Sequence, residues 1–180
     1  ADSEQGVNGF TADWPADLGE RPALWIPASS VSEARLEAAA GAETISDSRS
    51  LVTSPVLLAV PPQLQEALGE QNWGTLPGLQ ADPASLDGLG IPGWGGLRAA
   101  MPLTRDSDAA YLAAEAVAAA AAPTGAPASA GLGAVSTLIG AEPELPADDA
   151  GAAFDAMMDA PDPSTAPVHG VVTTEQRLFQ

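Results

Sequence analysis

The run of residues 51–60 limits the possible folds of this chain more than any other stretch, because it is the strongest strand signal in the sequence. Six of its ten residues are Leu or Val. Its second half alternates too little for a half-exposed strand, which predicts burial on both faces. Pro55 in its middle indicates a sheet edge, a bulge or a crossing point between two sheets.

Strand-like runs alternate with helix-like segments along the rest of the chain. The other strands are expected at 23–26, 97–103 and 168–172, and the helices at 31–40, 62–68, 109–122, 129–139, 149–159 and from 173 onward. Ser30 with Glu33, and Thr173 with Gln176, form capping boxes that mark two helix starts. This order predicts an α/β fold with layers and a mostly parallel sheet.

The charge of the chain is strongly one-sided. It has 24 acidic residues, six Arg and no Lys, which gives a net charge of −18. Such a field repels a phosphate backbone and an anionic membrane surface, so we expect no nucleic-acid partner. Without Cys, neither a disulfide nor a thiolate metal site can form. No run has the 18 or more apolar residues of a membrane span, so the chain is not expected to span a membrane.

Four segments resemble, in the same order, segments of the type II periplasmic (extracellular) solute-binding proteins. These segments are residues 23–30, 53–61, 97–107 and 171–176. The closest branch is the actinobacterial group in which a solute-binding-like region precedes a von Willebrand factor A-type domain. The resemblance covers about residues 22–176, and the first strand and first ligand-binding loop of the family have no counterpart in this chain.

The resemblance implies an incomplete type II periplasmic-binding-protein-like fold, with the second lobe and part of the first. Residues 1–20 are then an irregular segment, and residues 21–61 hold part of the first lobe and the hinge strand. Residues 62–176 form a second-lobe-like α/β region, and residues 177–180 begin a truncated return helix.

The function implied by the resemblance is non-enzymatic binding of a small polar or anionic ligand. The ligand would lie at helix N-termini in a cleft between the lobes, in a region that is secreted or anchored at the cell envelope. The targeting segment that such a location requires is not expected among these 180 residues. The alternative is a solute-binding fold retained as a cell-envelope protein-interaction or structural module. The partner is then an envelope protein, and under either hypothesis we expect no cofactor; the oligomeric state stays open.

The candidate ligand-binding residues are carried over from the family segments. They are Ser29, Ser30, Thr53, Ser54, Thr104, Arg105, Ser107, Thr173 and Thr174. Hydroxyls and backbone N–H groups bind oxygen atoms without a lysine, and only Arg105 adds a formal charge. Each has a structural alternative. Ser30, Ser107 and Thr173 occupy expected helix caps, Ser54 lies at the kink beside Pro55, and Arg105 can pair with Asp106 or Asp108.

Other chemistry-bearing residues favour structural interpretations. His169, the single histidine, could serve a Ser/His/Asp triad, but no G-x-S-x-G elbow occurs and we expect no catalysis. The glycines at 88–90 and 93–96 indicate turns. Phe154, Met157 and Met158 indicate core packing. Five acidic residues could suggest a cation site, namely Asp148, Asp149, Asp155, Asp159 and Asp162. They lack the spacing of a calcium-binding loop, so they indicate a solvated acidic face.

Overall fold

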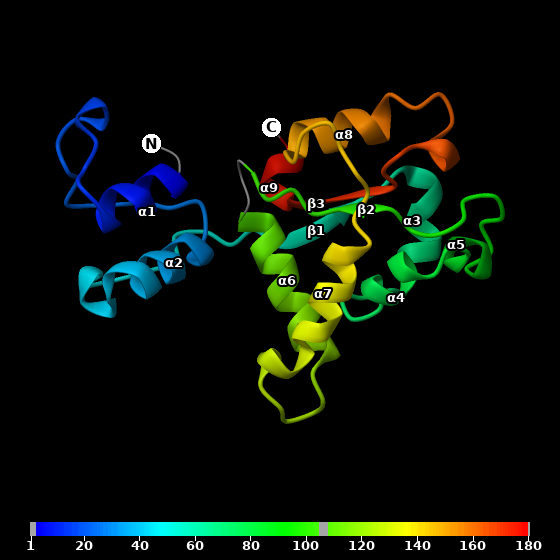
Figure 1. Cartoon of the computed structure of the whole chain (residues 1–180), viewed down its shortest axis with the longest axis horizontal. Coiled ribbons are helices and arrows are strands. Elements are labelled where there is room, and N and C mark those ends of the chain that lie inside the picture. Colours follow the sequence, from blue (N-terminus) through cyan, green and yellow to red (C-terminus); the bar gives the residue numbers. More distant parts are fainter. Residues whose placement is uncertain (1–2, 105–107, 180) are drawn as a thin grey trace. The chain divides into compact units, whose positions relative to one another are not determined.

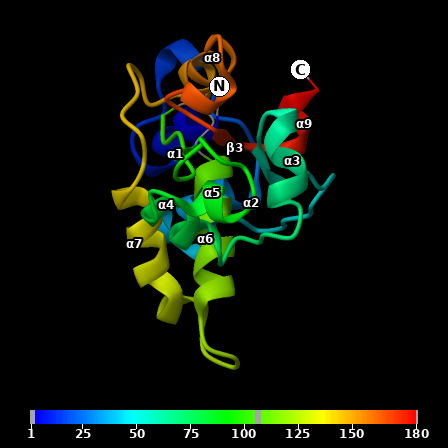
Figure 2. The same cartoon turned by 90° about the vertical axis from the view of Figure 1, so that its right-hand side faces the viewer.

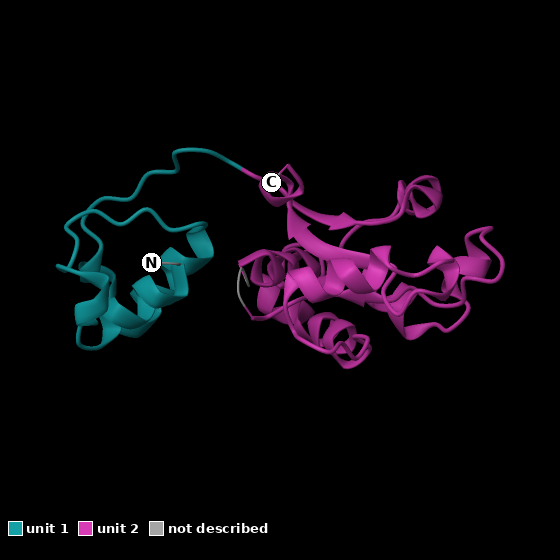
Figure 3. Ribbon diagram, turned by 90° about the horizontal axis from the view of Figure 1, so that it is seen from above, with its two compact units in different colours: residues 1–53 teal, residues 54–180 magenta. Residues whose placement is uncertain are grey.

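The computed structural model describes residues 3–104 and 108–179 (Figure 1). It consists of two compact units, residues 1–53 and residues 54–180 (Figure 3). The boundary falls within the run of residues 51–60, which was expected to form one strand.

The first unit is held together by aromatic rings beside two helices. Helix α1 (Ser3–Thr11) packs against α2 (Ser30–Ala40), and each is followed by a short 3₁₀ helix, η1 (Ala16–Leu18) and η2 (Ala42–Thr44). The Phe10 ring lies 5.1 Å from the Trp14 ring and 5.7 Å from the Trp25 ring, measured between centroids. These contacts bury one face of α1, so residues 3–11 are helical where an irregular segment was expected.

Helix α2 is capped one residue earlier than expected. Ser29 is extended, and its Oγ accepts a hydrogen bond from the Val31 N–H at 3.1 Å. Ser30, the expected cap, is the first helical residue instead. The helix ends before Gly41, as expected, and the Gly41 N–H donates to the Glu37 carbonyl.

The second unit contains a mixed sheet of three strands. Strands β1 (Val56–Ala59), β2 (Ala99–Ala100) and β3 (Gly170–Thr174) lie in the order β1-β3-β2. β1 pairs antiparallel with β3 and places Val56 opposite Thr174, whereas β2 pairs parallel with β3. The helices of this unit are α3 (Pro62–Leu68), α4 (Leu76–Ala81), α5 (Ser85–Gly88), α6 (Asp108–Ala121), η3 (Ala128–Gly131), α7 (Leu132–Gly140), α8 (Ala150–Met158), η4 (Pro163–Thr165) and α9 (Glu175–Leu178).

Helices cover both faces of this sheet. Helix α8 lies on one side, and α6 and α7 lie on the other (Figures 1 and 2). Consecutive residues of β3 point to opposite faces. Val172 joins the larger core with Leu64 and Leu138, and Val171 joins the smaller core beneath α8 with Met157.

The predicted layered fold with a mostly parallel, type II periplasmic-binding-protein-like sheet is wrong. The described residues form a helix-rich structure with three short strands, and only the β2–β3 pair is parallel. The run at 23–26 forms no strand, and the run at 51–60 is a strand only from Val56 to Ala59. Pro55 has no N–H to donate, which accounts for the late start of β1.

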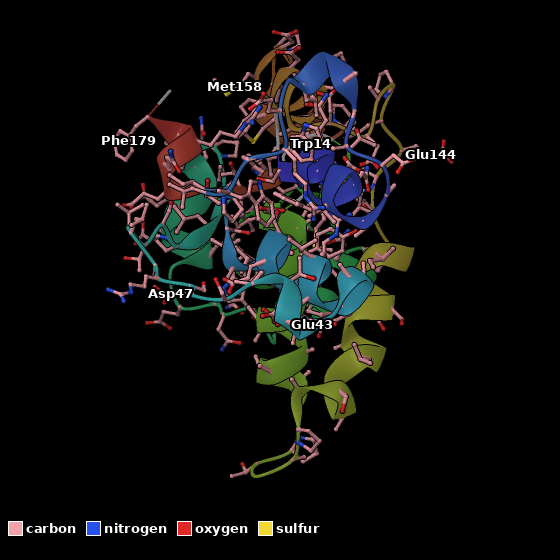
Figure 4. All side chains as sticks on the ribbon, turned by 90° about the vertical axis from the view of Figure 1, so that its left-hand side faces the viewer. Trp14, Glu43, Asp47, Glu144, Met158 and Phe179 are labelled. Atoms are coloured by element: carbon pink, nitrogen blue, oxygen red, sulfur yellow. The ribbon has the colours of Figure 1, made fainter. Side chains whose placement is uncertain are left out.

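The expected core packing of the Met157–Met158 pair is correct for only one of the two residues. Met157, on the inner face of α8, is 6% exposed and belongs to the smaller core, whereas Met158 is 70% exposed. Figure 4 labels Met158 at the periphery, with Phe179 likewise on the outside. The neighbouring residue of a buried helical position points about 100° away, so both could not face one core.

Candidate functional site

The predicted ligand-binding residues do not form one cluster. Ser29 and Ser30 lie in the first unit at the start of α2. Ser54, Thr173 and Thr174 come together in the second unit because β1 and β3 are antiparallel. Thr104 follows β2, Thr53 ends the first unit, and Arg105 and Ser107 lie outside the described residues.

The hydroxyl of Ser54 accepts a hydrogen bond from the start of α9. Its Oγ lies 2.9 Å from the Gln176 N–H group that donates to it. The adjacent Pro55 carbonyl accepts from the Glu175 N–H at 3.0 Å. These two bonds satisfy amide groups that the first turn of a helix leaves without a partner. Ser54 therefore connects the first residues of the second unit to its last helix, α9.

Thr173 lies inside β3 and does not cap the last helix as expected. Thr174 is the N-cap residue of α9, and its side chain makes no capping hydrogen bond. The Thr173 side chain is 1% exposed, and its Oγ1 has no hydrogen-bond partner in the described part of the chain. A buried hydroxyl without a partner costs folding free energy, so Thr173 is a position that needs an explanation.

Two carboxylates bind the edge of the segment that follows β2. Glu142 Oε1 accepts from the Met101 N–H at 2.6 Å, and Asp148 Oδ1 accepts from the Leu103 N–H at 2.9 Å. The Thr104 N–H and hydroxyl both donate to the Asp148 carbonyl. Burial raises the pKa of Glu142; the Met101 N–H opposes this, and the charge of Asp148 adds to it. These side chains take the place of a further strand at this edge.

The pairing of half-buried Arg98 with buried His169 was not foreseen from the sequence. The Arg98 Nε donates to the Ala166 carbonyl and its Nη2 to the Ser164 carbonyl, both at 2.9 Å. The guanidinium also contacts Nε2 of His169, whose ring is fully buried and lies 5.1 Å from the Trp94 ring. An Arg N–H always donates, so Nε2 is the acceptor in this contact, and the same nitrogen lies 3.3 Å from the Ser164 carbonyl oxygen.

The environment of His169 keeps its imidazole neutral. Burial lowers its pKa, and the positive charge of Arg98 lowers it further. The carbonyls of Ser164 and Gly96 oppose this shift, although Nδ1 lacks a partner with hydrogen-bond geometry among the described residues. The His169 ring is buried and contacts both Arg98 and Trp94. These contacts connect the segment that precedes β3 to the segment that precedes β2.

Two of the acidic residues around α8, Asp155 and Asp159, line a shallow pocket together with Ala and Pro residues. Its volume is about 470 Å³, and its lining consists of Pro146, Ala152, Asp155, Ala156, Asp159, Ala160 and Pro167. Within residues 3–104 and 108–179, no three His, Asp or Glu side chains lie close enough together to hold a metal ion. Asp149 has a structural role, since its Oδ1 caps α8 by accepting from the Ala152 N–H at 2.9 Å.

The segment from residue 116 to residue 141, called here the neutral hairpin, carries no charged residue. It contains the second half of α6, a connecting loop, η3 and α7, and it extends away from the sheet (Figures 1 and 2). Val135 and Leu138 face the core, whereas Leu132 and Ile139 are 56% and 45% exposed and lie on the flank of α7 beside Val135. The hairpin is therefore an uncharged, partly apolar surface on a strongly acidic chain.

Comparisons with known proteins identify relatives but no family. The whole chain is 62% identical to an uncharacterized protein of Mycobacterium tuberculosis, found in strains H37Rv and CDC 1551/Oshkosh. The 180 aligned residues span only 27% of the length of these relatives. No family model matches the chain, and no solved structure matches it. No helix in the described part of the chain is long and apolar enough to cross a membrane.

Proposed function

We propose that this chain is a non-enzymatic protein-interaction module of a longer polypeptide, and that its neutral hairpin binds a second copy of the chain. The observation that carries the proposal is the exposure of Leu132 and Ile139 on a surface without any charged residue. The length of the Mycobacterium tuberculosis relatives supports the placement in a longer polypeptide. The extracytoplasmic location implied by the resemblance stays a prediction.

Electrostatics favours the neutral hairpin as the place where two copies meet. Each copy carries a net charge of −18, so approach through most of the surface is opposed by repulsion. Every charged residue lies outside positions 116–141. Burial of exposed Leu and Ile side chains supplies a driving force of about 25 cal/mol per Å² of apolar surface. Gly133 and Gly140 leave open space on α7, since an added Cβ would meet nothing within 4 Å.

Sedimentation velocity tests this association over a range of protein concentrations. We expect a dimer that becomes stronger as NaCl rises from about 0.1 M to about 1 M, because the Debye length falls from about 10 Å to about 3 Å and the repulsion is screened. The double variant Leu132→Glu/Ile139→Glu should be monomeric throughout. The control Thr124→Glu/Ala126→Glu adds the same charge to the connecting loop of the hairpin and should still dimerise. A monomer at every concentration, or equal effects of the two variants, contradicts the proposal.

Binding of a small polar or anionic ligand is the second candidate function. It is favoured by the buried Thr173 hydroxyl, which has no partner among the described residues and lies beside Thr174. A thermal-shift panel of oxyanions, sugars and amino acids tests it, since a ligand at about 100 times its Kd stabilises a protein by about 2.7 kcal/mol.

The variant Thr173→Val separates ligand binding from folding. Without a ligand we expect it to raise the free energy of unfolding by about 1 kcal/mol, because a methyl group replaces an unpaired buried hydroxyl. If a ligand binds this hydroxyl, its thermal shift should disappear in the variant. An unchanged shift, or the absence of any shift across the panel, counts against this candidate.

A further inference from the structure

Residues 23–27 of the first unit have the side-chain alternation of a β-strand. Trp25 points inward and stacks edge-on against Phe10, with 5.7 Å between the ring centroids. Leu24 and Ile26, on either side of it, are 76% and 66% exposed. This period of two is the pattern of a strand with one face packed on its own unit. Here, however, the outward face is also apolar.

The backbone of this segment is unpaired as well. In the described part of the chain, the N–H groups of residues 24–26 form no hydrogen bond, whereas the Ala28 N–H donates to Ser3 Oγ at 2.8 Å. A backbone segment with free N–H and C=O groups is a template for pairing with another strand. Exposed Leu and Ile side chains in the same segment add apolar surface that such pairing would cover.

We infer that residues 23–27 form an edge strand that pairs with a β-strand of the longer polypeptide, outside the 180 residues of this chain. The aligned residues make up only 27% of the Mycobacterium tuberculosis relatives, so most of their length can supply this partner. This inference shares with the proposed function only the placement in a longer polypeptide, and it does not depend on the neutral hairpin.

A pre-formed sheet suits this segment better than a second copy of the same segment. Pro22 and Pro27 flank it and have no N–H to donate, so only a few residues between them can pair. A two-stranded ribbon of that length is too short to be stable in water. Added to an existing sheet, the same strand gains cross-strand contacts for Leu24 and Ile26 on a surface that is already ordered.

Hydrogen exchange measured by mass spectrometry tests the inference on the 180-residue chain and on the full-length Mycobacterium tuberculosis relative. We expect the amides of residues 24–26 to exchange rapidly in the chain, and their aligned counterparts to exchange about a hundredfold more slowly in the full-length protein. The amides of β3 serve as the control and should be protected in both. Equally rapid exchange in the full-length protein overturns the inference. Protection already present in the 180-residue chain also overturns it, because the covering segment would then lie within the chain.

A substitution provides a second, independent measurement. Leu24→Lys/Ile26→Lys should leave the Tm of the 180-residue chain unchanged, because both side chains are largely exposed. The aligned substitutions should lower the Tm of the full-length relative and abolish the protection of this segment. An unchanged Tm and unchanged protection in the full-length relative would show that no strand covers this face.

Discussion

Replacement of Gly131 by Ala is expected to destabilise the second unit by about 3 kcal/mol, at the upper end of the cost of overpacking. Gly131 ends η3 where this short helix passes over α6. An added Cβ would collide with the Ala118 carbonyl oxygen and lie 2.8 Å from the carbonyl carbon. Both groups belong to backbone, and neither can move aside as the end of a flexible side chain could. The clash must therefore push η3 and α6 apart.

Gly133→Ala is the matched control for this prediction. Gly133 lies two residues further along, inside α7, and its added Cβ would meet nothing within 4 Å. Because Ala favours helix more than Gly, this variant should gain up to about 1 kcal/mol. Urea unfolding followed by far-UV circular dichroism gives both free energies. Similar values for the two variants would show that η3 does not pack against α6 in this way.

Helices with local signals could be predicted from the sequence. Helix α6 was expected at 109–122 and occurs at Asp108–Ala121, and α8 was expected at 149–159 and occurs at Ala150–Met158. The Ala-rich composition of α6 and the Asp149 cap of α8 are properties of a few neighbouring residues, so no knowledge of the rest of the fold is needed.

The strand predictions were wrong where pairing depends on residues that are distant in the sequence. The run at 97–103 looks like a strand, but only Ala99 and Ala100 pair in the sheet. Beyond them, Pro102 lacks an N–H, and Glu142 and Asp148, about 40 positions further along the chain, accept the neighbouring N–H groups. The run at 23–26 has strand periodicity but no strand partner among the described residues. Apolar periodicity alone predicts neither situation.

The candidate sites likewise differ in whether neighbouring residues or residues far apart in the sequence define them. Ser54 and Thr174 come together only because β1 and β3 are antiparallel, which the predicted parallel sheet did not allow. Arg98 and His169 are 71 positions apart and carry no shared motif. The neutral hairpin, in contrast, is visible in the sequence as a long interval without charge, and the structure adds which face of α7 is exposed.

Arg98→Met is the second substitution with a large expected effect, a loss of about 3 kcal/mol in the free energy of unfolding. Methionine retains the apolar stem but leaves the carbonyls of Ser164 and Ala166 without their donors, at about 1–3 kcal/mol for each unpaired buried group. Arg98→Lys should lose less, since an ammonium keeps the charge but cannot reproduce the planar fork. The control Arg49→Met removes an exposed ion pair with Asp47 and should change stability little.

The pKa of His169 provides a second readout, and comparison of Arg98→Met with Arg98→Lys separates loss of the Arg98 charge from loss of packing, since either loss raises this pKa. It can be followed without assignment, because the chain has one histidine and hence one imidazole C2–H resonance in an NMR titration. Removal of the Arg98 charge should raise this pKa toward the ordinary value in Arg98→Met, while Arg98→Lys should keep it low.

In the wild type the lowered pKa means that the unfolded chain binds the proton more readily. The contribution of His169 therefore weakens folding as the pH falls below about 6.5, and this loss should shrink in Arg98→Met. If the pKa stayed low in that variant, burial alone would control the imidazole and the role of Arg98 would be limited to its carbonyl partners.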